Sequence, residues 1–89
     1  MIESDVQILN RLGLHARAAA RFVHLANTFS SRISVLKDGT RVDGKSILGL
    51  LTLAAAKGTR LRLTVDGADE REAAERLTAL VQDRFGEDD

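Results

Sequence analysis

The residue types that could do chemistry gather in residues 13–17, which read Gly-Leu-His-Ala-Arg. An alternating segment gives way there to helical spacing, so His15 falls at the start of an expected helix. The first N–H groups of a helix lack intrahelical partners and carry positive partial charge. An anion attached to the His15 ring would meet the N–H groups of Ala16 and Arg17, and the Arg17 guanidinium could pair with phosphate oxygens. The pattern favours a histidine that carries an anionic group.

A plainer interpretation of these residues stays open. His15 could serve only as an N-cap, and Arg17 could be a solvated surface residue. His24 lies on the polar face of the same expected helix, and we interpret it as a surface histidine. Two histidines at this spacing cannot share one helix face as a metal pair, and no acidic cluster completes a site. We therefore expect no metal ion.

Residues 39–46 match the expression of a nucleotide-binding P-loop, but their context disagrees with it. The first glycine belongs to an Asp-Gly hairpin signal, and residues 40–43 read as a strand rather than as a phosphate loop. We interpret Ser46 as the N-cap of a helix that begins at Ile47. The alternative is that Ser46 is phosphorylated, because a phosphate there would also meet a helix N-terminus.

The helix expected over residues 47–57 has more apolar residues than one buried face needs. We expect one set to face or border the sheet: Leu50, Leu53, Ala54 and Lys57. This leaves a second apolar strip, which consists of Ile47, Leu48 and Leu51. An exposed apolar strip beside a polar site usually marks a partner surface. The alternative is a helix that is buried on two sides.

The composition excludes several functional classes. Thirteen Lys and Arg balance 13 Asp and Glu, and the aromatic residues are three Phe, so we expect neither a nucleic-acid surface nor a base-stacking platform. The absence of Cys excludes disulfides, thiolate metal sites and cysteine nucleophiles. No apolar run approaches the roughly 18 residues of a membrane span. The acidic residues near the N-terminus do not form a signal peptide, so we expect a cytoplasmic protein.

The elements that must position these residues follow from switches between period two and period 3.6. Alternation predicts strands over residues 2–9, 31–37, 40–43 and 60–65. Helical spacing predicts helices over residues 16–29, 47–57 and 69–85. Strands with one polar face imply a sheet covered on one face only, which favours antiparallel pairing. The order βαββαβα predicts a single α+β domain over residues 1–89, an open-faced sandwich of two layers.

Two segments resemble the signatures of a known family. Residues 10–17 (Asn-Arg-Leu-Gly-Leu-His-Ala-Arg) and residues 44–49 (Gly-Lys-Ser-Ile-Leu-Gly) resemble HPr, the histidine-containing phosphocarrier of the bacterial phosphoenolpyruvate-dependent phosphotransferase system. The resemblance covers essentially the whole chain in length and element order. It implies three helices on one face of a four-stranded antiparallel sheet, in agreement with the predicted elements.

The resemblance also implies a role for each site residue. His15 would be phosphorylated on Nδ1, and Arg17 would steady the phosphate, with no cofactor. Ser46 would be the regulatory site of an HPr kinase/phosphorylase. The partner surface would consist of the strip Ile47, Leu48 and Leu51, with Ala20 and His24 at its edge. We therefore expect a monomeric carrier, not an enzyme, that takes a phosphoryl group from enzyme I and passes it to A-type or B-type enzyme II components.

Position 18 departs from the commonest signature of the family, which has proline after the arginine. Ala18 is a strong helix former, so the helix should persist with one more free N–H donor near the phosphate. The departure leaves open whether the chain serves a sugar branch or a nitrogen-related, NPr-like branch. A regulatory binding module controlled at Ser46 is a further alternative, although relatives of that kind lack the active histidine.

Overall fold

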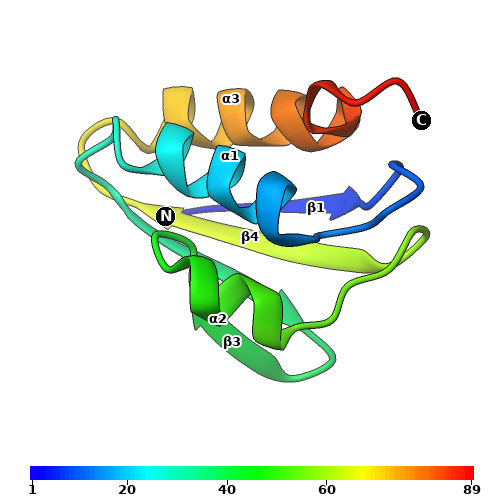
Figure 1. The fold of residues 1–89 in the computed structure, drawn as a ribbon. Coiled ribbons are helices and arrows are strands. Elements are labelled where there is room, and N and C mark those ends of the chain that lie inside the picture. Colours follow the sequence, from blue (N-terminus) through cyan, green and yellow to red (C-terminus); the bar gives the residue numbers. More distant parts are fainter.

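Four strands form one antiparallel sheet in the computed structural model, which describes all 89 residues (Figure 1). The strands are β1 (Ile2–Gln7), β2 (Arg32–Lys37), β3 (Thr40–Asp43) and β4 (Arg60–Asp66), in the spatial order β1-β4-β2-β3. Each neighbouring pair is antiparallel, and β1 pairs only with β4. The first and last strands of the sequence are thus neighbours in the sheet.

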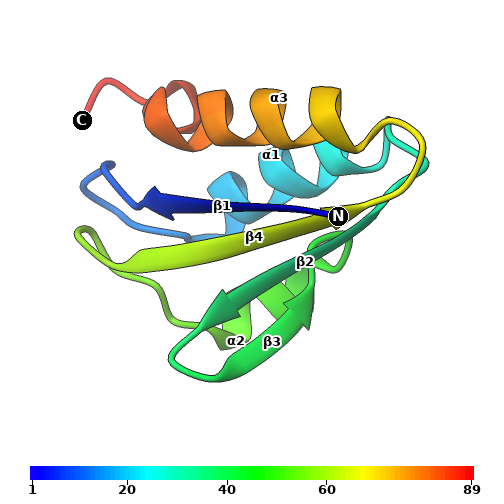
Figure 2. The same cartoon turned by 180° about the vertical axis from the view of Figure 1, so that it is seen from behind.

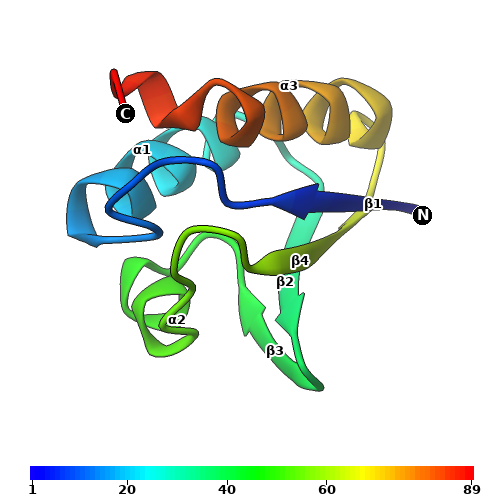
Figure 3. The same cartoon turned by 90° about the vertical axis from the view of Figure 1, so that its right-hand side faces the viewer.

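Three helices lie on the same face of this sheet. They are α1 (Ala16–Ala26), α2 (Ile47–Thr52) and α3 (Glu70–Gln82), and the short 3-10 helix η1 (Arg84–Gly86) follows α3. The opposite face of the sheet is open in Figure 2, and Figure 3 shows the helical layer from its side. The predicted α+β open-faced sandwich is confirmed. None of these helices has the length and apolar character needed to span a bilayer.

The core lies between the sheet and the helices, and it holds 22 buried apolar residues. Every second strand residue points into it, as in β4, where Leu61, Leu63 and Val65 are at most 4% exposed. Burying one such side chain stabilises a fold by about 1.5–3 kcal/mol. This alternation is the signal that predicted the strands, so the covered face of the sheet follows directly from the sequence.

The second helix is shorter than predicted, because it ends at Thr52 rather than at residue 57. Ala54 takes a left-handed conformation with φ 49°, and a right-handed α-helix cannot continue through such a residue. The carbonyl of Ala55 then accepts a hydrogen bond from the N–H of Leu14 at 2.9 Å. Residues 54–57 have therefore left the helix and pack against the loop that leads into α1.

The prediction for the faces of α2 is correct in part. Leu50 and Leu53 are buried, whereas Ala54 and Lys57 are exposed. The second strip is exposed, with Ile47 at 41%, Leu48 at 74% and Leu51 at 36%. The alternative of a helix buried on two sides is therefore wrong.

The other helices also end earlier than their apolar spacing predicts. α1 ends at Ala26 rather than at residue 29, and α3 ends at Gln82 rather than at residue 85. In both cases a phenylalanine beyond the end remains buried, Phe29 at 6% and Phe85 at 1% exposed. A turn can bury such a side chain as well as a helix can. Apolar residues at helical spacing therefore extend beyond the last residue of each helix. The first strand likewise ends at Gln7 rather than at residue 9.

Candidate functional site

His15 is the N-cap of α1, as predicted. Its backbone is extended, with φ −80° and ψ 178°, and helical geometry begins at Ala16. The ring atom Nδ1 accepts a hydrogen bond from the backbone N–H of Arg17 at 3.3 Å. A nitrogen that accepts a hydrogen bond holds a lone pair, so the nucleophilic nitrogen of this ring faces the helix start. The side chain is 27% exposed, which leaves the ring open to a reaction partner.

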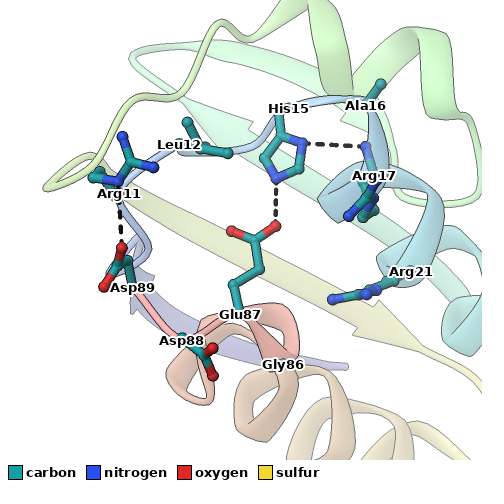
Figure 4. Close-up of a pocket in the computed structure, with 10 residues that line it drawn as sticks. All are labelled: Arg11, Leu12, His15, Ala16, Arg17, Arg21, Gly86, Glu87, Asp88 and Asp89. Carbon is teal, nitrogen blue, oxygen red and sulfur yellow. Dashed lines mark hydrogen bonds and ion pairs between the residues drawn. The ribbon is translucent and has the colours of Figure 1, made fainter.

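The opposite nitrogen of the ring contacts the C-terminal segment. Nε2 lies 2.5 Å from Oε2 of Glu87 (Figure 4). A carboxylate only accepts hydrogen bonds, so Nε2 carries the proton and donates it. The two contacts together assign the ring: Nε2 is protonated toward Glu87, and Nδ1 is free of a proton toward α1.

Asn10 holds Glu87 in this position. Its fully buried side chain donates from Nδ2 to Oε1 of Glu87 at 2.9 Å and to the carbonyl of Gly13 at 2.7 Å. The hydrogen bond from Asn10 is the largest cause that lowers the pKa of Glu87 below its ordinary value. Burial opposes it, while His15 and Arg21 add to the lowering. Glu87 is therefore ionised at neutral pH.

Gly13 sets the path of the chain into the site. Its φ of 71° is left-handed, and a Cβ at this position would lie 2.6 Å from the carbonyl oxygen of Ala55. Any other residue would meet both the strain and the close backbone approach. The glycine thus lets the loop before α1 lie against the segment after α2, which brings His15 to its place.

Ala16 and Arg17, which begin α1, line a pocket together with His15. The N–H group of Ala16 donates to no other group, and the exposed Arg17 side chain forms no ion pair. Arg21 is occupied, because it donates to the carbonyl of Phe85. Ten residues line an open pocket of about 650 Å³ here, which Figure 4 shows. A nucleophilic nitrogen beside an unused N–H donor and an unpaired guanidinium suits the covalent capture of an anion.

The other predicted site residues lie outside this pocket. Ser46 caps α2 as predicted, and its Oγ accepts from the N–H of Gly49 at 3.0 Å. Ala20 and His24 are exposed on α1, which packs beside α2 and its exposed strip. None of them lines the His15 pocket.

Asn10 and Glu87 are site residues that the sequence did not predict. Asn10 is the first residue of the segment that resembles the HPr signature, residues 10–17. Nothing in its type or spacing indicated that its side chain reaches the C-terminal segment. Glu87 follows Gly86 in an acidic stretch without periodicity, so no local signal distinguished it from solvated charge. The contact joins positions 15 and 87, and only the fold brings them together.

Comparison with known protein families identifies the family of this chain. The family described as "PTS HPr component phosphorylation site" matches residues 2–83. The chain belongs to the HPr family. HPr proteins are phosphocarriers of the phosphotransferase system, not enzymes. The family match ends before Glu87, so that residue lies outside it.

Individual relatives agree with the HPr assignment. The chain is 52% identical over 87 residues to the phosphocarrier protein HPr of Neisseria meningitidis serogroup A, and the match covers 98% of each chain. It also resembles the crystal structure of HPr-C-His from Thermoanaerobacter tengcongensis, with a TM-score of 0.95, 44% identity and 99% of each chain covered.

A third relative bears on the oligomeric state. Crh of Bacillus subtilis, a catabolite repression protein, is 45% identical with a TM-score of 0.77, and the match covers 94% of this chain and 97% of that one. That protein was solved as a domain-swapped dimer. The monomeric state expected for the present HPr-family chain therefore stays a prediction.

Proposed function

We propose that the protein accepts a phosphoryl group from enzyme I on Nδ1 of His15 and passes it to A-type or B-type enzyme II components. The observation that carries this proposal is the orientation of the His15 ring, whose Nδ1 lone pair faces the start of α1. The proposed carrier works as a single chain in the cytoplasm and needs no metal or cofactor.

The transfer proceeds by displacement at phosphorus. The Nδ1 lone pair forms the new P–N bond, while the bond from phosphorus to the donor breaks and its electron pair leaves with the donor. The phosphoryl oxygens then meet the N–H groups of Ala16 and Arg17, and the Arg17 N–H exchanges its hydrogen bond to Nδ1 for one to a phosphoryl oxygen. These donors are oriented before the reaction, so little reorganisation is needed when charge arrives. Transfer to the acceptor reverses the same steps.

Arg17 supplies the mobile charge of the site. Its guanidinium forms no ion pair in the unphosphorylated chain, and a guanidinium can hold two phosphate oxygens at once. It is therefore available to the incoming phosphoryl group without breaking an existing contact. This assigns Arg17 to steadying the phosphate and His15 to bonding with it.

The exposed strip of Ile47, Leu48 and Leu51, with Ala20 and His24 at its edge, is the proposed docking surface for enzyme I and the acceptors. Ser46 directly precedes this strip, and we assign its hydroxyl to an HPr kinase/phosphorylase. A phosphate on Ser46 would put a dianion beside the apolar surface. Desolvating this dianion when enzyme I docks costs several kcal/mol unless the charge is paired. A cost of that size is enough to weaken docking strongly.

Incubation with phosphoenolpyruvate and enzyme I tests the proposal. We expect the protein to gain one phosphate that is labile in acid and stable in base, measured by intact-mass spectrometry. The phosphorylated chain is then offered to sugar-related and nitrogen-related enzyme II components, which identifies the branch. A chain that gains no such phosphate is not a carrier, and a purely regulatory module would give that result.

A further inference from the structure

Glu87 stands apart from the other acidic residues of the C-terminal segment. Its side chain is 17% exposed, and both of its oxygens are used, one by Asn10 and one by His15. The neighbouring Asp88 is exposed and forms no hydrogen bond or ion pair. A carboxylate that is enclosed and aimed at one ring nitrogen has a more specific role than solvated charge.

Several charged side chains lie near the His15 ring, and one of them, Glu87, is bonded to it. Charged groups also line the pocket from other elements: Arg11 from the loop before α1, Arg17 and Arg21 from α1, and Asp88 and Asp89 from the C-terminal segment. Asp89 is paired with Arg11, with 3.5 Å between Oδ2 and Nε. Among the carboxylates, Glu87 is the one bonded to the ring (Figure 4).

The two ring nitrogens have different surroundings. A phosphoryl group on Nδ1 would lie toward α1, and Glu87 binds the opposite nitrogen, so the two do not compete for space. Bond formation at Nδ1 spreads positive charge over the ring, and the Nε2–H then donates to Glu87 more strongly. The carboxylate can therefore remain in contact through the whole reaction.

The proton on Nε2 decides how easily the phosphoryl group leaves. When the P–N bond breaks, its electron pair returns to Nδ1. With a proton on Nε2 the group that leaves is a neutral imidazole, whereas without that proton it is an imidazolate, a much stronger base and a poorer leaving group. The same proton directs attack in the forward step, because it leaves Nδ1 as the nitrogen with a lone pair.

We propose that Glu87 is a positioning residue that keeps the proton on Nε2 of His15, so that the phosphoryl group enters and leaves through Nδ1 with neutral imidazole as the leaving group. This inference rests on the proposed function and deepens it. No proton moves between His15 and Glu87 during transfer: the carboxylate stays ionised, as its lowered pKa requires, and Nε2 stays protonated.

The test measures how fast the phosphorylated ring loses its phosphoryl group to water as the pH changes. Phosphoramidate is the phosphoryl donor, so the measurement does not depend on enzyme I, and ³¹P NMR follows the release of phosphate. The variant is Glu87→Gln, which keeps the size and a hydrogen-bond acceptor but removes the charge. The matched control is Asp88→Asn, which removes the neighbouring carboxylate that does not touch the ring.

We expect the wild type and Glu87→Gln to release phosphate at similar rates at pH 6, where protons are abundant. At pH 8.5 the variant should be slower by about tenfold, the effect of a shift of about one pH unit in the loss of the Nε2 proton. Asp88→Asn should follow the wild type throughout. In ¹⁵N spectra of the phosphorylated ring, the proton should leave Nε2 at lower pH in Glu87→Gln than in the wild type.

Two results would overturn the inference. One is a Glu87→Gln profile that coincides with the wild type from pH 6 to pH 9. The other is a variant that is slower by the same factor at every pH with unchanged ¹⁵N titration, which would show a merely structural role. Failure of enzyme I to phosphorylate the wild type would refute the proposed function instead, and the two failures are therefore distinguishable.

Discussion

The starts of α1 and α3 offer the same backbone donors but have opposite surroundings. The first turn of α1 contains no acidic residue, and its cap is the His15 ring. The first turn of α3 contains Glu70 and Glu72, so its positive end already faces carboxylates. One helix start is neutralised by its own sequence, and the other is the proposed site of the phosphoryl group.

The acidic residues at α3 also have structural partners. Asp69 accepts hydrogen bonds from the Ser31 hydroxyl and from the N–H groups of Ser30 and Ser31, and these bonds lower its pKa, the hydroxyl most. Glu70 lies 2.9 Å from the N-terminal ammonium, which is the largest cause that lowers the Glu70 pKa. The start of α3 therefore joins β1 and the turn before β2 to the helix. The proposed phosphate site thus lies at the helix start that has no acidic residue of its own.

Among the changes that test the contrast between the starts of α1 and α3, removal of His15, the proposed phosphate acceptor, should have the largest effect. His15→Ala should abolish phosphorylation by enzyme I, because no other nucleophile lies at that helix start. The loss of the cap should cost only about 1 kcal/mol of folding free energy, so the fold should persist. Mass spectrometry and a thermal melt measure both effects. An undiminished phosphate adduct on the alanine variant would refute the assignment.

Removing the free cation at α1 should have a large but partial effect. Arg17→Ala should slow transfer about tenfold to a hundredfold, since a hydrogen bond to a charged group is worth about 1.5–3 kcal/mol and the backbone donors remain. Rapid-quench kinetics give the rate. Arg60→Ala, which removes an exposed arginine from β4, is the matched control and should leave the rate unchanged. Equal rates for both variants would make Arg17 a solvated residue.

The start of α2 offers an intermediate case, because Ser46 is both a cap and a proposed regulatory site. Ser46→Asp should raise the apparent KM for enzyme I several-fold with an unchanged Tm, since aspartate is as good a cap as serine. Ser46→Ala should do the reverse and lower stability by about 1 kcal/mol at an unchanged KM. A wild-type KM for the aspartate variant would show that enzyme I docks elsewhere than on the strip.

The smallest expected change is at α3, and it concerns stability alone. Asp69→Asn should lower Tm by about 5 °C at pH 7 and leave phosphoryl transfer unaffected. Because the pKa of Asp69 is lower in the folded state, its stabilising contribution is complete above about pH 4 and is lost as the pH falls through the folded-state pKa. The melting temperatures of variant and wild type should therefore converge as the pH falls below the lowered pKa of Asp69. A variant that also slowed transfer would break the separation of the two helix starts.

Local patterns predicted the parts of the molecule that local physics determines. The alternation in β4, the cap at Ser46 and the glycine before His15 each follow from residue type and spacing. The early end of α2 could not be predicted, because it depends on the bond between Leu14 and the Ala55 carbonyl. The contact of Glu87 with His15 had no sequence signal for the same reason: it needs α3 to carry the C-terminus back to the start of α1.

The position of β4 between β1 and β2 has a consequence for the synthesis of the chain. β1 is made before its hydrogen-bonding partner β4, which follows the first two helices, and Glu87 is made after both β4 and α3. Contacts of such wide sequence separation form late in folding. A nascent chain therefore cannot close its sheet before β4 has been made, nor complete the contacts of His15 before Glu87 has been made.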